Sequence, residues 1–215
     1  MTIDAKMTER TQARYQRIAP FYDAMEALSE RRFRVWRPQL WSLVRGPKVL
    51  EVGVGTGKNL PYYPKGLAIT AIDLTPGMLK RAQQRARNFN LDAELRLGDV
   101  QALDFPDNTF DTVVATCVFC SVPDPVLGLH EIARVVKPGG QVLLLEHMRA
   151  ANPMLGLLMD ALNPLVVRMM GANINRRTIE NVQRSGMQLK SVKDVGLGGI
   201  FKMIVATQDD EIKNG

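Results

Sequence analysis

Between residues 48 and 147 the spacing of apolar positions alternates between two patterns. Short runs of mostly branched apolar residues, suited to strands buried on both faces, alternate with stretches in which apolar residues recur every three to four positions, as on one face of a helix. This alternation predicts an α/β fold with a doubly wound, mostly parallel sheet. The expected strands lie near 48–53, 68–73, 93–97, 109–116 and 140–146, and the expected helices near 57–63, 76–89 and 124–136.

Proline and glycine mark the expected ends of two of these helices. Pro76 and Gly77 stand where the helix near 76–89 should begin, and Gly139 and Gly140 stand where the helix near 124–136 should end. Proline suits the first turn of a helix, and glycine is common just past the last turn. We therefore expect a new strand to start after the glycine pair.

The chain before residue 47 has a helical pattern. Apolar residues recur every three to four positions from about Thr8 to Val44, and Pro20 and Pro38 are expected to break this stretch into separate helices. Residues 1–7 show no such pattern and are expected to be irregular.

After residue 147 the pattern changes again. Residues 152–170 are rich in Met and Leu, residues 175–185 have a helical pattern, and the stretches 189–195 and 201–207 alternate like a pair of antiparallel strands. The expected division of the chain is an N-terminal helical lid or interface segment at 1–46, a main domain at 47–207 with a helical insertion at 154–185, and a disordered tail at 208–215.

The first expected strand breaks into a glycine-rich turn. Three glycines follow in the order Gly53-x-Gly55-x-Gly57, and they allow a sharp turn and a close approach by a ligand. A dinucleotide fingerprint would place its third glycine at position 58, which is Lys58. Glu51 lies two residues before the first glycine, where its carboxylate would repel a pyrophosphate. The turn therefore favours a cationic ligand.

Further motifs follow in order along the chain. Asp73 ends the second strand about 20 residues beyond the first glycine, the offset at which an acidic residue meets ribose hydroxyls in nucleotide-binding folds. Asp99, the Phe110–Val114 run and residues 135–140 come next. Over residues 45–147 this ordered set resembles the class I S-adenosylmethionine (SAM)-dependent methyltransferases, specifically the ubiquinone/menaquinone-biosynthesis branch. The resemblance implies a seven-stranded Rossmann-like sheet with an antiparallel C-terminal edge, an N-terminal helical lid, and SAM as cofactor.

The resemblance also implies roles for individual residues in cofactor binding. Asp73 would accept from the ribose diol, Asp99 and the backbone of Val100 would meet the adenine edge, and Leu74 and Met78 would cover the ring. Each acidic residue has an ordinary alternative, because Asp favours turns at strand ends and Glu51 suits a salt bridge. The expected cofactor residues are Tyr22, Glu51, Gly53, Gly55, Gly57, Asn59, Asp73, Leu74, Met78, Asp99, Val100 and Thr116.

Three residues are candidates for catalysis. His147 ends the fifth expected strand, at the edge where open α/β sheets bind ligands, and an imidazole with a pKa of roughly 6.5 suits a base. Tyr15 and Tyr22 lie in a segment that resembles the part of the family that folds over SAM as a lid. A structural histidine and simple lid packing are the alternatives.

Composition limits the partners. The 215 residues suit one domain, and the formal net charge of +6 is uneven, because residues 1–46 hold nine Lys or Arg against five Asp or Glu. Arg31, Arg32, Arg34 and Arg37 alternate with aromatic residues that include Trp36 and Trp41, a mixture suited to anionic headgroups. An anionic membrane surface is therefore expected, with a solvated arginine run as the alternative. No signal peptide and no run of 18 apolar residues is visible, so the expected location is cytoplasmic and possibly peripheral at the membrane.

The two cysteines, Cys117 and Cys120, form a C-x-x-C pair, and the chain has only two histidines. No metal site is expected from so few ligands. We expect reduced, partly buried thiols, with Cys120 lining the pocket of the methyl acceptor.

The acceptor is left among several classes. The branch includes quinone C-methyltransferases and bacterial phosphatidylethanolamine N-methyltransferases, and residues 116–122 followed by Glu146 and His147 also resemble membrane-associated alkyl-thiol methyltransferases. Quinone enzymes usually have R-N-V where this chain has Cys120, Ser121 and Val122. N-methylation of a phospholipid amine is therefore favoured, with thiol S-methylation and quinol C-methylation as alternatives. A nucleic-acid methyltransferase is disfavoured, since no [DNS]-P-P-[YFW] motif is present, and a non-catalytic SAM-binding protein is the remaining class.

Overall fold

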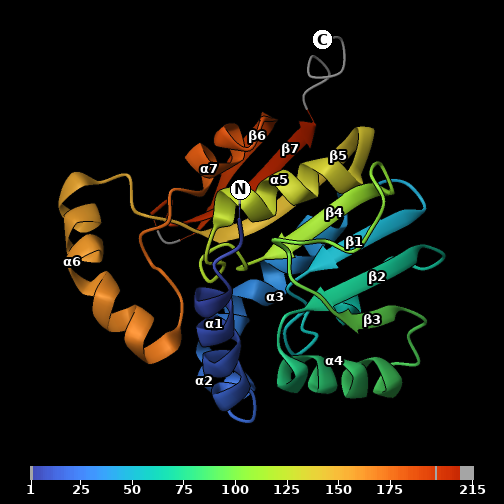
Figure 1. Cartoon of the computed structure of the whole chain (residues 1–215), viewed down its shortest axis with the longest axis horizontal. Coiled ribbons are helices and arrows are strands. Elements are labelled where there is room, and N and C mark those ends of the chain that lie inside the picture. The colour runs from blue at the N-terminus through green and yellow to red at the C-terminus, as the bar shows by residue number, and fades with distance from the viewer. Residues whose placement is uncertain (1, 197, 209–215) are drawn as a thin grey trace.

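A computed structural model describes residues 2–196 and 198–208, and it contains one seven-stranded sheet (Figure 1). The strand order is β3-β2-β1-β4-β5-β7-β6. The first five strands pair in parallel, and β7 pairs antiparallel with both β5 and β6, as the sequence predicted. The strands are β1 (Lys48–Val52), β2 (Ala68–Asp73), β3 (Glu94–Leu97), β4 (Phe110–Thr116), β5 (Val136–His147), β6 (Met187–Gly196) and β7 (Phe201–Gln208).

Helices cover both faces of the sheet because the central strands are apolar on both sides. Along β5, Leu144 packs with the face that carries α5 and α7, whereas Leu143 and Leu145 pack with the face that carries α3, as the twofold repeat of a strand requires. The helices are α1 (Ala5–Ile18), α2 (Tyr22–Met25), α3 (Ala27–Trp41), the 3₁₀ turn η1 (Leu60–Tyr62), α4 (Pro76–Asn88), α5 (Pro125–Val135), α6 (Pro153–Met170) and α7 (Thr178–Arg184).

The helix expected near 57–63 is only the single turn η1. The glycines before it are the reason, since Gly53, Gly55 and Gly57 all have positive φ angles, between 57° and 83°. A continuous right-handed helix needs negative φ, so the chain after β1 stays a loop until Leu60.

Gly139 and Gly140 were expected to mark the end of the helix near 124–136, but α5 ends before them, at Val135. Strand β5 begins directly at Val136, and the pair lies inside it. Phe110 pairs with Val136 and Thr112 with Gln141, so residues 137–140 bulge out of the ladder. A Cβ on Gly140 would lie 2.9 Å from the carbonyl oxygen of Asp111, which explains why glycine stands at this bulge.

The N-terminal segment differs from the prediction in two places. Helix α1 already begins at Ala5, because the carboxylate of Asp4 caps it by accepting from the backbone N–H of Met7 at 3.0 Å. Pro38 lies inside α3 instead of breaking it. The buried side chains Trp36 and Leu40 pack this helix on the sheet, and that packing outweighs the lost backbone bond.

The C-terminal elements follow the prediction. Helix α6 starts after Asn152, whose side chain caps it, and contains Pro164. It stands apart from the sheet at the left of Figure 1. The expected tail lies, from residue 209 on, outside the residues that the structure describes.

Candidate active site

The carboxyl ends of β1, β2 and β4 meet where the strand order reverses, next to β1. Open α/β sheets bind ligands at this point. The chain leaves β1 through Gly53, whose φ is +67°, and a Cβ there would lie 2.5 Å from Val118. Gly55 also has a positive φ, but its Cβ position is open on all sides to 4 Å. The first glycine is therefore required by packing, and the second leaves bare backbone facing free space.

A cavity opens at this edge, with an empty volume of about 750 Å³ including its mouth. This size suits a small-molecule ligand. A second compartment adjoins it and shares Tyr22, Gly53, Gly55, Thr116 and Cys117. Among the residues expected to bind cofactor, Gly57 alone lines neither compartment. The others that line them are Tyr22, Glu51, Gly53, Gly55, Asn59, Asp73, Leu74, Met78, Asp99, Val100 and Thr116.

Asp73 ties the glycine loop to the end of β2. Its carboxylate accepts the backbone N–H of Gly55 at 2.8 Å on one oxygen and that of Thr75 at 2.8 Å on the other. Burial raises the pKa of Asp73, against the effect of these two bonds. Each oxygen has a second lone pair, so the side chain can still accept from two hydroxyl groups of a ligand in the cavity.

Glu51 is fully buried at the end of β1. Its carboxylate accepts from the amide of Asn59 at 2.6 Å and from the hydroxyl of Tyr63. Arg37 in turn donates to the Asn59 side chain at 2.6 Å. Burial raises the pKa of Glu51 to about 7, although Tyr63, Asn59 and Arg37 all oppose this shift. A cation in the adjoining compartment would favour the ionised form.

Asp99 and Val100 stand at the other end of the cavity. The backbone N–H of Gln101 donates to Asp99 at 2.9 Å, which fixes the carboxylate at the cavity wall. Val100, Leu74 and Met78 supply apolar surface around it. A flat, partly polar group such as an aromatic base fits between such a carboxylate and such walls.

Tyr15 and Tyr22 reach the cavity from the N-terminal helices. The hydroxyl of Tyr15 is hydrogen-bonded to that of Ser121, and the two tyrosine rings lie 6.3 Å apart. Burial raises the pKa of both phenols well above the usual value. Both side chains are therefore neutral near pH 7, suited to hydrogen bonding and not to taking a proton.

His147 ends β5, as predicted, but it is not among the residues that line the cavity. Its ring packs edge to face on Phe201 at 5.2 Å, and burial lowers its pKa. The neighbouring Glu146 instead faces the loop that follows β4. One oxygen of Glu146 accepts from the backbone N–H groups of Val118 at 2.8 Å and Phe119 at 3.2 Å.

Glu146 therefore fixes the loop after β4, a role that the sequence analysis did not assign to it, although it named Glu146 in the resemblance to the alkyl-thiol enzymes. A single carboxylate after the apolar run 142–145 was the signal, because buried charges need partners. Of the two cysteines, Cys117 lines the cavity and Cys120 is buried behind it, the reverse of the expectation. Burial, with Glu146 nearby, raises the pKa of both thiols.

The sequence is similar to a known protein family and to several known enzymes. A family model described as a methyltransferase domain matches residues 50–144. A phosphatidylethanolamine N-methyltransferase from Cereibacter sphaeroides is 48% identical over 105 residues, which cover 48% of this chain and 52% of that protein. A demethylmenaquinone methyltransferase from Renibacterium salmoninarum is 33% identical over 176 residues, 80% of this chain and 71% of that protein. The C-methyltransferase UbiE of Roseobacter denitrificans, named for ubiquinone and menaquinone biosynthesis, is 31% identical over 205 residues, covering 87% and 82%.

Solved structures share the fold. A SAM-dependent methyltransferase from Thermotoga maritima, titled a possible histamine N-methyltransferase, superposes with a TM-score of 0.69 at 20% identity, covering 92% of this chain and 99% of that one. The cyclase SpnF superposes with a TM-score of 0.67 at 19% identity, covering 82% and 80%. Different reactions on one fold mean that these likenesses support the architecture alone.

The chain belongs to the SAM-dependent methyltransferase family. It is an enzyme of this class, and its cofactor is SAM. The cavity fits that cofactor, because it offers open glycine backbone at Gly55, acidic side chains at both ends and apolar walls between them.

We expect Asp73→Ala to weaken SAM binding by about 1.5–3 kcal/mol, because the variant loses charged hydrogen bonds to the ligand and the hold on Gly55. Isothermal titration calorimetry would measure the loss. Asp92→Ala is the matched control, since Asp92 is exposed beyond α4. Unchanged affinity in a folded Asp73→Ala protein would remove this residue from the site.

Proposed function

We propose that this enzyme transfers a methyl group to the amine of a phosphatidylethanolamine-type lipid. The observation that carries the proposal is the 48% identity to the Cereibacter enzyme, against 33% or less for the two quinone-methylating relatives compared above. That match spans about half of the Cereibacter protein, so the assignment of the acceptor also rests on the local chemistry of the site.

At the cofactor side, each group of residues would bind a different part of SAM. SAM supplies an electrophilic methyl on a sulfonium cation. Asp73 would hold the ribose hydroxyls, and Leu74, Met78 and Val100 would enclose the adenine, with Asp99 at its edge. Glu51, fixed by Asn59, would offset the positive charge of the methionyl end.

At the acceptor side, the loop after β4 supplies a neutral wall. The loop residues that line the cavity are Cys117, Val118, Ser121, Val122 and Pro123. Burial favours the neutral form of an amine, so a lipid amine entering this cavity would lose its proton to solvent and become a nucleophile. The hydroxyls of Tyr15, Tyr22 and Ser121 could then orient it, and no ionised base is needed. The position of His147 gives it no such contact, so we do not assign it the role of base.

Quinol C-methylation is the second candidate. Its support is the length of the match, since the UbiE relative aligns over 87% of this chain. The loop after β4 argues against this candidate, because Cys120 and Ser121 stand where the quinone enzymes typically have a polar R-N pair.

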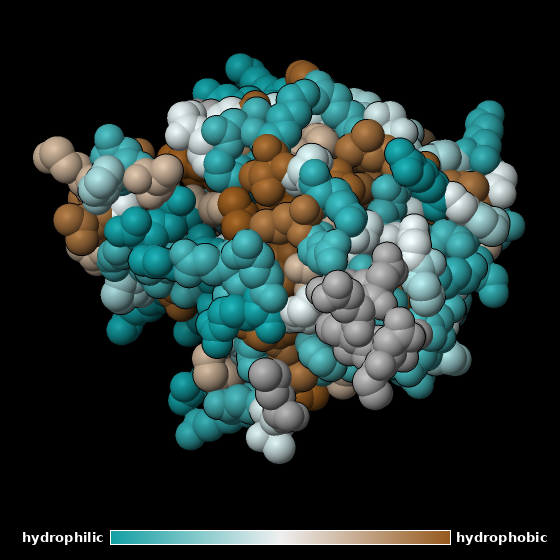
Figure 2. Space-filling model, turned by 90° about the horizontal axis from the view of Figure 1, so that it is seen from above, coloured by the Kyte–Doolittle hydropathy of each residue, from teal (hydrophilic) through white to brown (hydrophobic). Residues whose placement is uncertain are grey.

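The surface supports an acceptor that resides in a membrane. Many large apolar side chains of α6 are exposed, and the projection at the left of Figure 2 carries apolar atoms at its outer edge. In the part of the chain that the structure describes, none of the helices could span a bilayer. The exposed apolar side chains of α6 would instead lie against the membrane surface. The exposed residues are Met154, Leu155, Leu157, Leu158, Leu162, Leu165 and Met169.

Helix α3, which carries the arginine run, offers a membrane less apolar surface than the sequence predicted. Arg31, Arg32 and Arg34 are exposed, but Arg37, Trp36 and Trp41 are buried. The tryptophans belong to the core on the α3 side of the sheet and cannot enter a membrane. We therefore assign the apolar part of the membrane contact to α6 and only a charge contribution to α3.

The acceptor is tested by supplying labelled SAM with three separate substrates in the same neutral vesicles: phosphatidylethanolamine, a demethylmenaquinol and a long-chain alkyl thiol. We expect label in the phosphatidylethanolamine fraction. Label in the quinol alone would favour the second candidate, and label in the thiol alone would exclude both.

Tyr22→Phe should lower turnover roughly tenfold with little change in SAM affinity, if its hydroxyl orients the acceptor by one hydrogen bond. His147→Ala should retain turnover, because the ring packs on Phe201 outside the cavity. Steady-state kinetics and calorimetry separate the two effects. The opposite result, with the histidine variant inactive, would place the base at the end of β5.

Replacing Leu157, Leu158 and Leu165 by serine should weaken binding to phosphatidylethanolamine–phosphatidylglycerol vesicles at least tenfold, since burying one leucine contributes about 1.5–3 kcal/mol. SAM affinity should not change. Vesicle co-sedimentation is the measurement, and Phe89→Ser, an exposed apolar residue after α4, is the control. Equal sedimentation of all proteins would exclude α6 as the membrane contact.

A further inference from the structure

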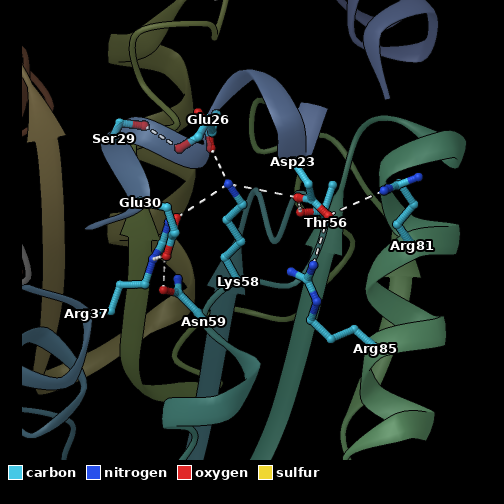
Figure 3. A network of polar contacts seen from close by, with 10 residues as sticks. All are labelled: Asp23, Glu26, Ser29, Glu30, Arg37, Thr56, Lys58, Asn59, Arg81 and Arg85. Atoms are coloured by element: carbon cyan, nitrogen blue, oxygen red, sulfur yellow. Dashed lines mark hydrogen bonds and ion pairs between the residues drawn. The ribbon is translucent and has the colours of Figure 1, made fainter. Parts of the chain in front are cut away.

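A cluster of charged side chains joins the N-terminal segment to the rest of the enzyme, and Asp23 of α2 is at its centre (Figure 3). One oxygen of Asp23 accepts from the hydroxyl of Thr56 in the glycine loop at 2.6 Å. The other oxygen lies 2.9 Å from the guanidinium of Arg85 and 3.4 Å from that of Arg81, both on α4. Asp23 thus contacts two elements that border the cofactor cavity.

Lys58 of the glycine loop extends the cluster to the next helix. Its ammonium lies 3.0 Å from Glu26, 3.4 Å from Glu30 and 3.9 Å from Asp23, and 5.6 Å from the centre of the Tyr22 ring. Figure 3 shows the lysine pointing up between these carboxylates. Burial opposes ionisation of Asp23, but Thr56, Arg85 and Lys58 outweigh it and lower its pKa, so the Asp23 carboxylate is charged near neutral pH.

The segment 5–26, which we call the strap, is held on the enzyme mainly by polar contacts. Among the described residues of the strap, Ala19 alone is buried, and Tyr15 and Tyr22 are half-buried against the cavity. Further bonds run from Gln12 to the carbonyl of Leu74 at 2.9 Å and from the N–H of Gly77 to Gln16 at 2.8 Å. A segment with little buried apolar surface opens at low cost, so these polar contacts decide whether it stays closed.

The strap also closes the cavity on one side. Thr11, Tyr15 and Tyr22 all line it, and Tyr22 directly precedes Asp23 in the chain. A ligand enclosed by these side chains cannot leave past them unless the strap moves. Since the charged groups that hold it are partly exposed, their attraction is weakened by salt.

We propose that Asp23 is a positioning residue for the cofactor: it holds Tyr22 over the cavity through Thr56, Lys58, Arg81 and Arg85, and the release of these contacts admits SAM and frees its demethylated product. This role does not depend on the identity of the methyl acceptor. It predicts that cofactor exchange is gated by ion pairs and accelerates with ionic strength.

The first test is the rate at which S-adenosylhomocysteine, the demethylated product, dissociates from the 215-residue chain, measured by stopped-flow displacement at low and high salt. Asp23→Asn should raise the rate roughly tenfold at low salt, because changes at a charged contact act mainly on dissociation, and should remove most of the salt dependence. Asp23→Glu should restore part of the wild-type behaviour. Asp92→Asn, with an exposed carboxylate beyond α4, is the matched control and should match the wild type.

The second test needs no ligand. Amide hydrogen exchange of the free protein should accelerate within residues 5–26 in Asp23→Asn, while amides of β1 and β4 keep their protection. The double variant Asp23→Asn with Arg85→Gln should exchange no faster than Asp23→Asn alone, because the same contact is already lost. Unchanged dissociation and exchange rates in Asp23→Asn would overturn the proposal. A uniform rise in exchange across the sheet would also overturn it, since Asp23 would then only stabilise the fold.

Discussion

The bond between the Asp73 carboxylate and the backbone N–H of Gly55 is the contact on which the site depends. Strands β1 and β2 pair in parallel as far as Val52 and Ile72, and the N–H of Val54 continues this pairing by donating to Ile72. The bond from the Gly55 N–H to Asp73 extends the contact between the two segments by one more residue beyond the sheet. It holds an otherwise irregular loop in register with β2, so that bare backbone and a carboxylate face the same space. The other residues that line the cavity surround this fixed point.

The sequence predicted the parts of the site that are local in the chain. Asp73 ends β2 and Asp99 follows β3, and parallel strands bring their carboxyl ends to one edge, so the strand pattern indicates that the two lie near each other, whereas the resemblance supplied their roles. The sequence pattern could not show which residues far apart in the chain contact each other. Arg37 looked like a surface cation, yet it is buried against Asn59, 22 residues away. Glu146 reaches Val118 over 28 residues, and no local pattern indicates that bond. Pro38 and the glycine pair in β5 were misread because tertiary packing overrode their usual meaning.

The sheet and the helices outside it contribute differently to the cavity and the surface of this enzyme. The sheet edge carries the residues that we assign to the cofactor, the strap lines the same cavity, and α6 is the surface that we propose for membrane contact. The cavity and α6 are mechanically linked: the backbone and side-chain amides of Asn173, just after α6, donate to the carbonyl of Cys120 at 2.8 and 3.0 Å, and Asn173 contacts Asn163 of α6. A displacement of α6 on a surface would therefore be transmitted to the loop after β4.

The position of Cys117 bears on whether the enzyme methylates its own side chains. A protein that encloses an alkylating agent exposes its own side chains to the same chemistry, and a sulfur anion is the most susceptible of them. Cys117 lines the cavity, but burial and the nearby Glu146 carboxylate keep its sulfur protonated. A protonated thiol is a poor nucleophile, so the carboxylate that fixes the loop also protects the enzyme from becoming its own substrate.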